Sequence, residues 1–161
     1  MHAAILTISD KGSRGEREDK SGAAIREIVE EMGGEVISHD IVPDEQDIIE
    51  NALKKLAHSA ELVLTTGGTG LAPRDVTPEA TRAVIDREIP GIAEAMRQKS
   101  LEIVSTAMLS RAVAGARGHT LIINLPGSPK AVRECLSFVR AAIPHALELL
   151  RGEGGECGRA E

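Results

Sequence analysis

The sequence predicts an α/β fold: a single domain of three layers, in which a mostly parallel sheet is covered by helices on both faces. Three observations lead to this prediction. The chain has 161 residues, a length typical of one domain that can bury a sizeable core. Strand-like and helix-like segments alternate along it, which is the pattern of βαβ units. The strand-like segments are nearly continuous apolar runs, as expected for strands buried on both faces.

Residues 1–42 are expected to form a strand, a loop, a helix and a second strand. The apolar run at the start is far too short for a signal peptide and predicts the first strand. The Gly-, Ser- and Lys-rich residues 10–20 predict a polar loop. Apolar residues recur at helical spacing over 25–32 until two glycines end the helix. Residues 34–42 carry β-branched bulk and predict a strand, which Pro43 ends.

In the middle of the chain, proline and threonine mark the starts of helices. Thr77 can cap a helix and Pro78 suits the first helical position, so a helix is expected to begin there. Pro90 and Gly91 interrupt the pattern and separate this helix from the next. We expect helices near 48–57, 78–86 and 91–103 and a buried strand at 61–66.

The last third contains one clear strand and one long helical stripe. Residues 105–118 are ambiguous, because 112–114 could form a small strand before a turn, and 101–114 could feed either the core or an interface. Residues 120–125 predict a strand. The helical stripe from Val132 to Leu150 contains Pro144, which is expected to kink it. Residues 151–161 are expected to be a flexible acidic tail after a domain spanning 3–150.

Composition excludes several classes of function. Lys and Arg number 19 against 25 Asp and Glu, which gives a net charge of −6 and argues against general nucleic-acid binding. Phe138 is the one aromatic residue, so stacking platforms for single strands are missing. No stretch approaches the ~20 apolar residues of a membrane span. A cytoplasmic protein without a nucleic-acid or membrane partner is the expectation.

The cysteines and histidines do not predict a metal site. Cys135 lies in a helical apolar stripe and Cys157 in the tail, which favours a core thiol and a loose end over a metal or redox role. The five histidines have no spacing typical of zinc ligands.

Three expected strands end in small or polar residues: Ser9-Asp10, the Gly67-Gly68-Thr69-Gly70 run, and 124–128. The carboxyl ends of parallel strands meet at one edge of the sheet, where ligands bind. The glycine run is not a Walker loop, because no Gly-Lys-Ser/Thr follows. It also fails as a dinucleotide fingerprint, since Pro73 stands in the third glycine position. It is either a tight turn or, as we favour, a phosphate cradle.

The run Pro126-Gly127-Ser128-Pro129-Lys130 opens a helix. Ser128 and Pro129 suffice for capping, but the cation of Lys130 is unfavourable at a helix N-terminus unless an anion is present. Capping alone and ligand binding therefore both stay open here.

Two carboxylates, Asp44 and Asp75, lie in loops that precede expected helices. Asp75 precedes the expected cap Thr77, has no evident structural task, and is interpreted as functional. From the residues alone, Asp44 is expected to cap the helix that follows it. The loop 10–15 carries two cations and is either a flap or a solvated connection.

These motifs together resemble the molybdenum cofactor biosynthesis family of the MogA/MoaB type, over essentially residues 3–150. The matching runs are Ile41-Val42-Pro43-Asp44, Thr65-Thr66-Gly67-Gly68-Thr69-Gly70, Arg74-Asp75-Val76-Thr77-Pro78-Glu79-Ala80, Ser110-Arg111-Ala112-Val113 and Leu125-Pro126-Gly127-Ser128-Pro129-Lys130-Ala131.

The resemblance implies a molybdopterin adenylyltransferase: molybdopterin and ATP give adenylyl-molybdopterin and pyrophosphate, with Mg²⁺. It implies that Asp44 and Asp75 are catalytic. Because Mg²⁺ prefers oxygen ligands and keeps several waters, we expect these two carboxylates to hold it directly or through water. It also implies a homotrimer that hands its product to a molybdenum-insertion protein. Together with the strand-end argument, the expected substrate-binding positions are Ser9, Asp10, Gly67, Gly68, Thr69, Gly70, Arg74, Gly127, Ser128 and Lys130.

Two other functions stay open at this point. A non-catalytic molybdopterin carrier or assembly protein could use the same fold, because fold does not fix function. An oxidoreductase that depends on nicotinamide or another nucleotide is the other, and Pro73 argues against it.

Overall fold

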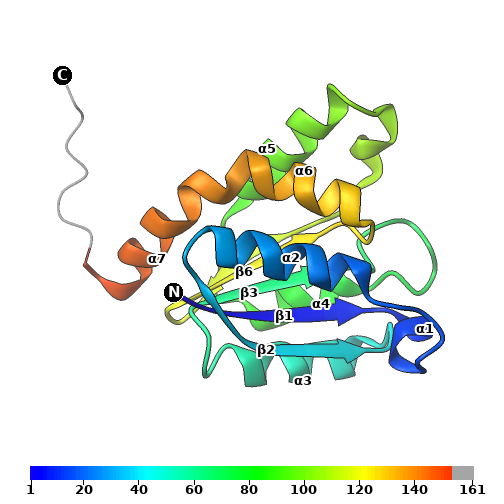
Figure 1. Cartoon of the computed structure of the whole chain (residues 1–161), viewed down its shortest axis with the longest axis horizontal. Coiled ribbons are helices and arrows are strands. Elements are labelled where there is room, and N and C mark those ends of the chain that lie inside the picture. The colour runs from blue at the N-terminus through cyan, green and yellow to red at the C-terminus, as the bar shows by residue number, and fades with distance from the viewer. Residues whose placement is uncertain (154–161) are drawn as a thin grey trace.

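The structure is a computed structural model that describes residues 1–153. In this part of the chain the strands form a six-stranded sheet in the order β2-β1-β3-β6-β5-β4 (Figure 1). The strands are β1 (His2–Ile8), β2 (Glu35–Val42), β3 (Leu62–Thr66), β4 (Arg87–Glu88), β5 (Ala114–Arg117) and β6 (Thr120–Leu125).

The sheet is mostly parallel, as predicted. Strands β2, β1, β3 and β6 run parallel, while β5 pairs antiparallel with β6 and β4 antiparallel with β5. β4 was not expected, because its two exposed residues give no apolar pattern. β5 begins at Ala114, where the possible strand at 112–114 was expected to end.

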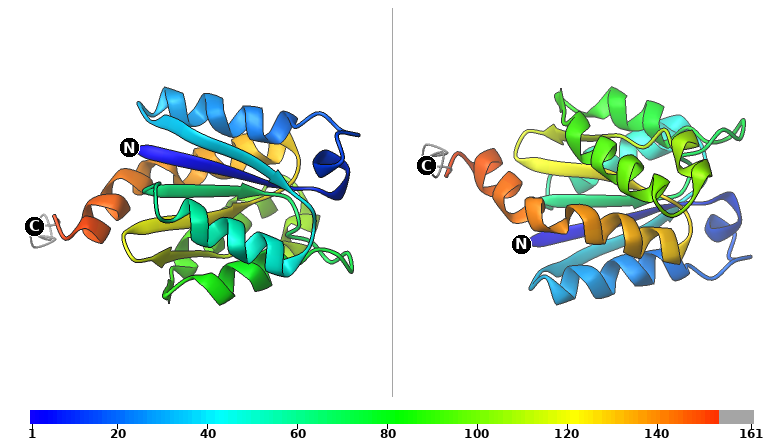
Figure 2. Two further views of the ribbon diagram at one scale, coloured as in Figure 1. Left: turned by 90° about the horizontal axis from the view of Figure 1, so that it is seen from below. Right: turned by 90° about the horizontal axis from the view of Figure 1, so that it is seen from above.

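Helices cover both faces of the sheet, which confirms the three layers (Figures 1 and 2). Helices α2, α5, α6 and α7 contribute to the core on one face, and α3 and α4 to the core on the other. The helices are α1 (Asp10–Ser13), α2 (Lys20–Glu31), α3 (Gln46–Leu56), α4 (Thr77–Val84), α5 (Pro90–Leu101), α6 (Pro129–Val139) and α7 (Ile143–Arg151), with 3₁₀ turns η1 (Ser105–Leu109) and η2 (Arg140–Ala142).

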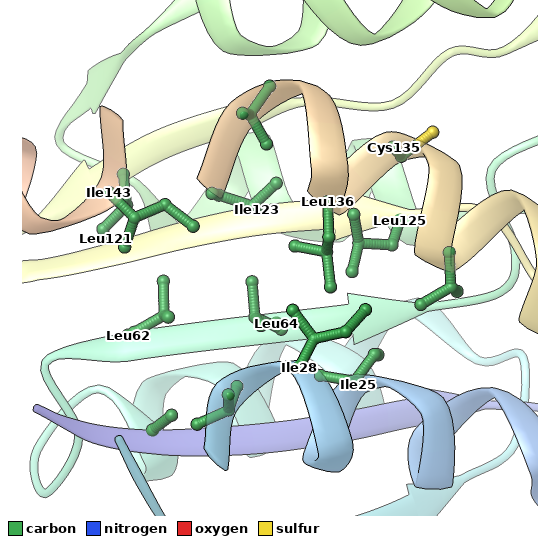
Figure 3. Packing of buried hydrophobic residues seen from close by; sticks show 14 of the residues in the cluster. Ile25, Ile28, Leu62, Leu64, Leu121, Ile123, Leu125, Cys135, Leu136 and Ile143 are labelled. Carbon is green, nitrogen blue, oxygen red and sulfur yellow. The ribbon is translucent and has the colours of Figure 1, made fainter. Parts of the chain in front are cut away.

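The larger core cluster packs α2 and α6 onto the middle of the sheet (Figure 3). Ile25 of α2, Leu64 of β3 and Leu136 of α6 are fully buried at this contact. Cys135, also on α6, is 7% exposed, which confirms the predicted core thiol. Cys157 and most of the predicted tail lie outside the described residues.

Two expectations about helices were wrong. Residues 10–20 were expected to be a loop, but 10–13 form the short helix α1, which Ser9 caps by accepting the N–H of Gly12. The final stripe was expected to be one kinked helix, but it is two helices, α6 and α7. Pro144 lies in the first turn of α7, where a residue without an N–H is tolerated, so it helps to start a helix there.

The register brings four strand ends to one edge of the sheet. Ile8 pairs with Val42, Thr7 with Thr66, and Thr66 with Leu125. The chain leaves β1 and β3 in opposite directions across the sheet, so a topological switch point lies between these two strands. Within residues 1–153, no helix is long and apolar enough to cross a membrane.

Candidate functional site

A cavity of about 660 Å³ opens at the carboxyl ends of β1 and β3. Its wall comes from the segment after β1, the start of α2, the loop after β2, the glycine turn after β3 and the loop before α6. The lining residues are Thr7, Ile8, Ser9, Gly12, Glu16, Arg17, Glu18, Asp19, Lys20, Ser21, Asp44, Thr66, Gly67, Gly68, Asp75, Gly127 and Pro129. A larger cavity, of about 810 Å³, lies at the opposite end of the sheet around Glu61 and His119, and contains none of the predicted site residues.

The predicted site residues divide into three groups. Six line the 660 Å³ cavity: Ser9, Asp44, Gly67, Gly68, Asp75 and Gly127. Thr69 and Gly70 instead line a smaller, more apolar cavity of about 270 Å³ on the side of α5. Asp10, Arg74, Ser128 and Lys130 are not among the lining residues of these cavities.

The glycine turn is packed tightly against β1 and α4. Gly67 and Gly68 have φ of +96° and +64°, which favour glycine. A Cβ on Gly67 would lie 2.3 Å from the backbone oxygen of Ile8, and one on Gly68 would lie 2.3 Å from Oγ1 of Thr77. A tight turn therefore explains both glycines sterically. The N–H groups of Gly68, Thr69 and Gly70 donate to no other group within residues 1–153, so they are available to an anion.

Thr77 supports this turn and does not cap α4. The residue before the first turn is Val76, no side chain caps the helix, and Thr77 Oγ1 donates to the carbonyl of Gly67 at 2.9 Å. The predicted capping role of Thr77 was wrong. The hydroxyl of Thr77 binds the glycine turn instead of the helix. Because the two residues are ten positions apart, local sequence patterns do not predict this bond.

Asp44 does not cap α3 either. That helix begins after Glu45 without a side-chain cap, and Asp44 Oδ2 instead accepts the N–H of Asp10 at 2.8 Å. Asp10 Oδ1 in turn accepts the N–H of Asp44 at 3.1 Å. Burial raises the pKa of Asp44, and the nearby charges of Asp10 and Asp75 raise it further. Its second oxygen, Oδ1, lies 3.3 Å from where a Cβ of Gly68 would be.

Asp10 and Arg74 bind each other. Arg74 donates from Nε to Asp10 Oδ2 at 2.5 Å and from Nη2 to Oδ1 at 2.9 Å. The bidentate bond to Arg74 lowers the pKa of Asp10, against the smaller opposing effect of burial. Asp10 is therefore positioned to orient Asp44 and to link the loop of Arg74 to β1.

Asp75 has a structural task that the sequence interpretation missed. Its Oδ2 accepts the N–H of Ala72 at 3.0 Å. Arg111 holds the same loop by donating to the carbonyls of Gly70 at 2.8 Å and Asp75 at 2.6 Å, and it also pairs with Glu79. Oδ1 of Asp75 has no hydrogen-bond partner within residues 1–153. Arg111 appeared in a matching motif, but nothing local in the sequence assigned it this task.

The start of α6 is capped as predicted, since Ser128 Oγ accepts the N–H of Ala131 at 3.2 Å. The side chain of Lys130 is 83% exposed and lies 3.9 Å from Glu134, one turn along the same helix. Lys130 therefore has a partner other than a ligand. Gly127 lies against the glycine turn, with its Cβ position 3.5 Å from Cα of Gly67.

Asp19, which sequence reasoning did not single out, is the most completely hydrogen-bonded acid of the cavity wall. It accepts from Thr7 Oγ1 at 2.5 Å, His39 Nε2 at 2.8 Å, the N–H of Gly22 at 2.8 Å and Ser21 Oγ at 3.1 Å. Burial opposes ionisation, but these bonds prevail and hold the pKa of Asp19 well below its usual range. An Asp directly before a helical stripe is a typical N-cap, so its capping of α2 could have been predicted.

The donor set of the cavity fits a hard divalent cation that keeps water in its shell. Within residues 1–153, no group of three or more His, Cys, Asp or Glu side chains could hold a metal. Asp44 and Asp75 each leave one oxygen without a hydrogen bond from the described residues, and the negative charge of Asp75 raises the pKa of Asp44. Two carboxylates plus water and substrate oxygens are the usual environment of Mg²⁺.

Comparison with known proteins places this geometry in a family. A family model described as a probable molybdopterin binding domain matches residues 4–145. Molybdopterin adenylyltransferase of Helicobacter pylori (strain J99) is 48% identical over 156 residues, which cover 94% of this chain and 89% of that protein. The enzyme of the same name from Escherichia coli K12 is 44% identical, over 94% of this chain and 86% of that protein.

The solved structures agree with these relatives. The molybdopterin biosynthesis enzyme MoaB of Thermus thermophilus superimposes with a TM-score of 0.88 at 54% identity, covering 94% of this chain and 96% of that chain. The resemblance found from the motifs is confirmed, and the chain belongs to the molybdopterin-binding family of molybdenum cofactor biosynthesis proteins.

Proposed function

We propose that the protein is a molybdopterin adenylyltransferase, which transfers AMP from ATP to the phosphate of molybdopterin. The observation that carries the proposal is that Asp44, Asp75, the Gly67-Gly68 turn and Gly127 line one cavity at the switch point of the sheet. The relatives named molybdopterin adenylyltransferase support it, because they match over nearly the whole chain.

In this reaction an oxygen of the molybdopterin phosphate attacks the α-phosphorus of ATP. A P–O bond forms there, the bond from the α-phosphorus to the oxygen bridging it to the β-phosphate breaks, and pyrophosphate leaves. The second pKa of a phosphate monoester is about 6, so the nucleophile is already largely ionised at pH 7 and no general base is needed. The protein has to align two polyanions and offset their repulsion.

Residues that line the cavity and their neighbours in the chain divide this work. The N–H groups of Gly68, Thr69 and Gly70, and the N–H of Lys130 at the start of α6, donate to no group within residues 1–153 and bind phosphate oxygens. The Asp10–Arg74 pair orients Asp44. Mg²⁺, held by the free oxygens of Asp44 and Asp75, would offset the charge of the phosphates and of both carboxylates. Because Lys130 is exposed and paired with Glu134, the α6 contribution rests on its backbone rather than on this cation.

The proposal extends to assembly and location. Large apolar side chains at the end of α5 and in the segment before β5, which could have fed the core or an interface, are exposed: Leu101, Ile103, Val104, Met108 and Leu109. Such a patch is typical of a subunit contact, so it supports the homotrimer expected from the family. We propose a 3–150 domain that works in the cytoplasm, where ATP is available, and passes its product to a molybdenum-insertion protein.

A pyrophosphate-release assay with molybdopterin, ATP and Mg²⁺ tests the function. We expect release only when all three are present, in an amount equal to the adenylyl-molybdopterin formed. Tight molybdopterin binding without pyrophosphate release would favour a carrier or assembly protein instead. Tight binding of NADH with no response to ATP in calorimetric titrations would contradict both of these functions.

A further inference from the structure

The segment between α1 and α2, residues 14–19, forms a wall of the 660 Å³ cavity that the motifs did not assign. Glu16, Arg17 and Glu18 all line the cavity. Glu16 is paired with Arg14, and Glu18 lies 3.9 Å from Lys20. Arg17 has no hydrogen-bond or ion-pair partner within residues 1–153, so its guanidinium is available to a ligand.

This wall is fixed at both ends, so Arg17 is not on a freely moving loop. At one end, the N–H of Glu16 donates to the carbonyl of Lys11 at 2.9 Å, and Ser9 caps α1. At the other end, Asp19 is bound to Thr7 of β1 and His39 of β2. A Cβ on Gly22 would lie 2.4 Å from both Asp19 Oδ2 and His39 Nε2, so the carboxylate and imidazole rest directly on the first turn of α2.

The charges of the cavity wall show what Arg17 can do. Asp19 is ionised but already accepts four hydrogen bonds, Glu16 is paired with Arg14, and Asp44 and Asp75 are the pair suited to a metal ion. Lys20 is already close to Glu18. Within residues 1–153, Arg17 is thus the unpaired cation on the wall, and its planar guanidinium can bind two phosphate oxygens at once.

We propose that Arg17 binds the phosphate groups of the substrates in this cavity, with residues 14–19 as its fixed support. The inference rests on the proposed function and adds a binding residue to it. The ligand chemistry is that of a phosphate ester or polyphosphate, which both ATP and the molybdopterin phosphate provide. Separate measurements of KM for the two substrates decide which of them Arg17 contacts.

The test compares Arg17→Gln, Arg17→Lys and the matched control Lys11→Gln, which removes a charge from the neighbouring helix α1 at an exposed position outside the cavity lining. Binding of inorganic pyrophosphate in the presence of Mg²⁺ is measured by calorimetric titration, and KM for ATP and for molybdopterin by pyrophosphate release. Because a charge-assisted hydrogen bond is lost, we expect Arg17→Gln to raise the pyrophosphate Kd and one KM about tenfold or more. Arg17→Lys should restore part of the loss and Lys11→Gln should match the wild type.

Two results would overturn the inference: unchanged constants in Arg17→Gln, or an equal rise in Lys11→Gln, which would indicate only the general field of the loop. If the wild type released no pyrophosphate, the proposed function would fail separately. The titration with pyrophosphate would still decide whether Arg17 binds phosphate. Thermal unfolding of each variant checks that the fold is retained.

Discussion

Asp44 and Asp75 lie on the wall of one cavity, where burial raises the pKa of Asp44 and the negative charge of Asp75 raises it further. Each carboxylate uses one oxygen to accept a backbone N–H, from Asp10 and Ala72 respectively. These bonds hold both side chains in place. Oδ1 of Asp44 and Oδ1 of Asp75 accept no hydrogen bond from residues 1–153 and can bind a cation. Like charges held together at a stability cost are typical of functional sites, and a divalent cation would remove the repulsion.

Asp75→Asn is expected to lower the adenylylation rate about a hundredfold or more, because the proposed mechanism uses this carboxylate to hold the Mg²⁺ that offsets the charge of the transferring phosphate. The fold should be retained, since the amide oxygen of the variant can still accept the N–H of Ala72. Asp86→Asn is the matched control, because Asp86 also accepts one backbone N–H, from Gly118, at the opposite end of the sheet. Unchanged turnover of Asp75→Asn at saturating Mg²⁺ would remove Asp75 from the mechanism.

The raised pKa of Asp44 predicts a pH-dependent response to Mg²⁺. A carboxyl whose pKa is higher in the folded state binds protons more tightly there, so its ionisation costs stability above that pKa and the cost disappears as pH falls through it. Without metal, Asp44→Asn should therefore be at least as stable as the wild type at neutral pH. Adding Mg²⁺ should raise the wild-type midpoint by about 2–4 °C per kcal/mol of binding free energy, and that of the variant much less.

Thermal unfolding with and without Mg²⁺, at neutral pH and again below the raised pKa, measures this response. The wild-type shift should shrink at the lower pH, where protons displace the cation. An equal Mg²⁺-induced shift in the wild type and in Asp44→Asn would exclude Asp44 as a ligand.

Asp19 should affect the free energy of unfolding with a pH dependence opposite to that of Asp44, because its pKa is shifted in the opposite direction. Its pKa is lowered in the folded state, so its stabilising contribution is present above its ordinary value near 3.8 and is lost as pH falls through the folded value. Asp19→Asn weakens the bonds from His39 and Thr7 and should cost about 2 kcal/mol at pH 7. Asp47→Asn, an exposed residue in the first turn of α3, should cost little.

Urea unfolding at pH 7 and at successively lower pH gives the difference between wild type and Asp19→Asn. That difference should stay constant down to about pH 5 and shrink below about pH 4. A difference that grew in acid would contradict the assigned direction of the pKa shift.

Much of the fold could be predicted, because its parallel strands carry their own signal. β3 and β6 are fully buried and read as apolar runs, so they were found within a residue of their true bounds. β4 could not be found, since two exposed residues at a sheet edge are ordered by pairing with β5 rather than by their own pattern. Helix α1 could not be found either, because it is a single turn whose cap, Ser9, directly follows β1.

The sequence predicted the positions of the glycines in the candidate site better than the hydrogen-bond partners of its side chains. Strand ends and glycine spacing are local, and they led to Gly67, Gly68 and Gly127 at one edge. The partners of Asp44 and Thr77 come from segments 34 and 10 residues away, so local capping rules gave the wrong assignment for both. Arg17 was missed because a charged residue in a polar loop has the same pattern whether it faces solvent or a cavity.

The glycine turn allows a test that separates backbone strain from close packing. Gly67 and Gly33 both have positive φ, +96° and +74°, so alanine is strained at either position. A Cβ on Gly33 would meet nothing within 4 Å, whereas one on Gly67 would lie 2.3 Å from the backbone oxygen of Ile8. Gly33→Ala should therefore cost about 1 kcal/mol, and Gly67→Ala at least about 2 kcal/mol more, because a strand end has to move.

Urea unfolding of the two variants measures this difference, and pyrophosphate release shows its functional side. Movement of Gly67 away from Ile8 displaces the N–H groups of the glycine turn relative to Asp44, so Gly67→Ala should lose activity under conditions where it is still folded. Gly33 follows the C-terminus of α2, whereas the start of that helix lines the cavity, so Gly33→Ala should keep wild-type kinetics. Equal losses of stability in the two variants would mean that β1 yields easily, and the turn would then not be held in place by Ile8.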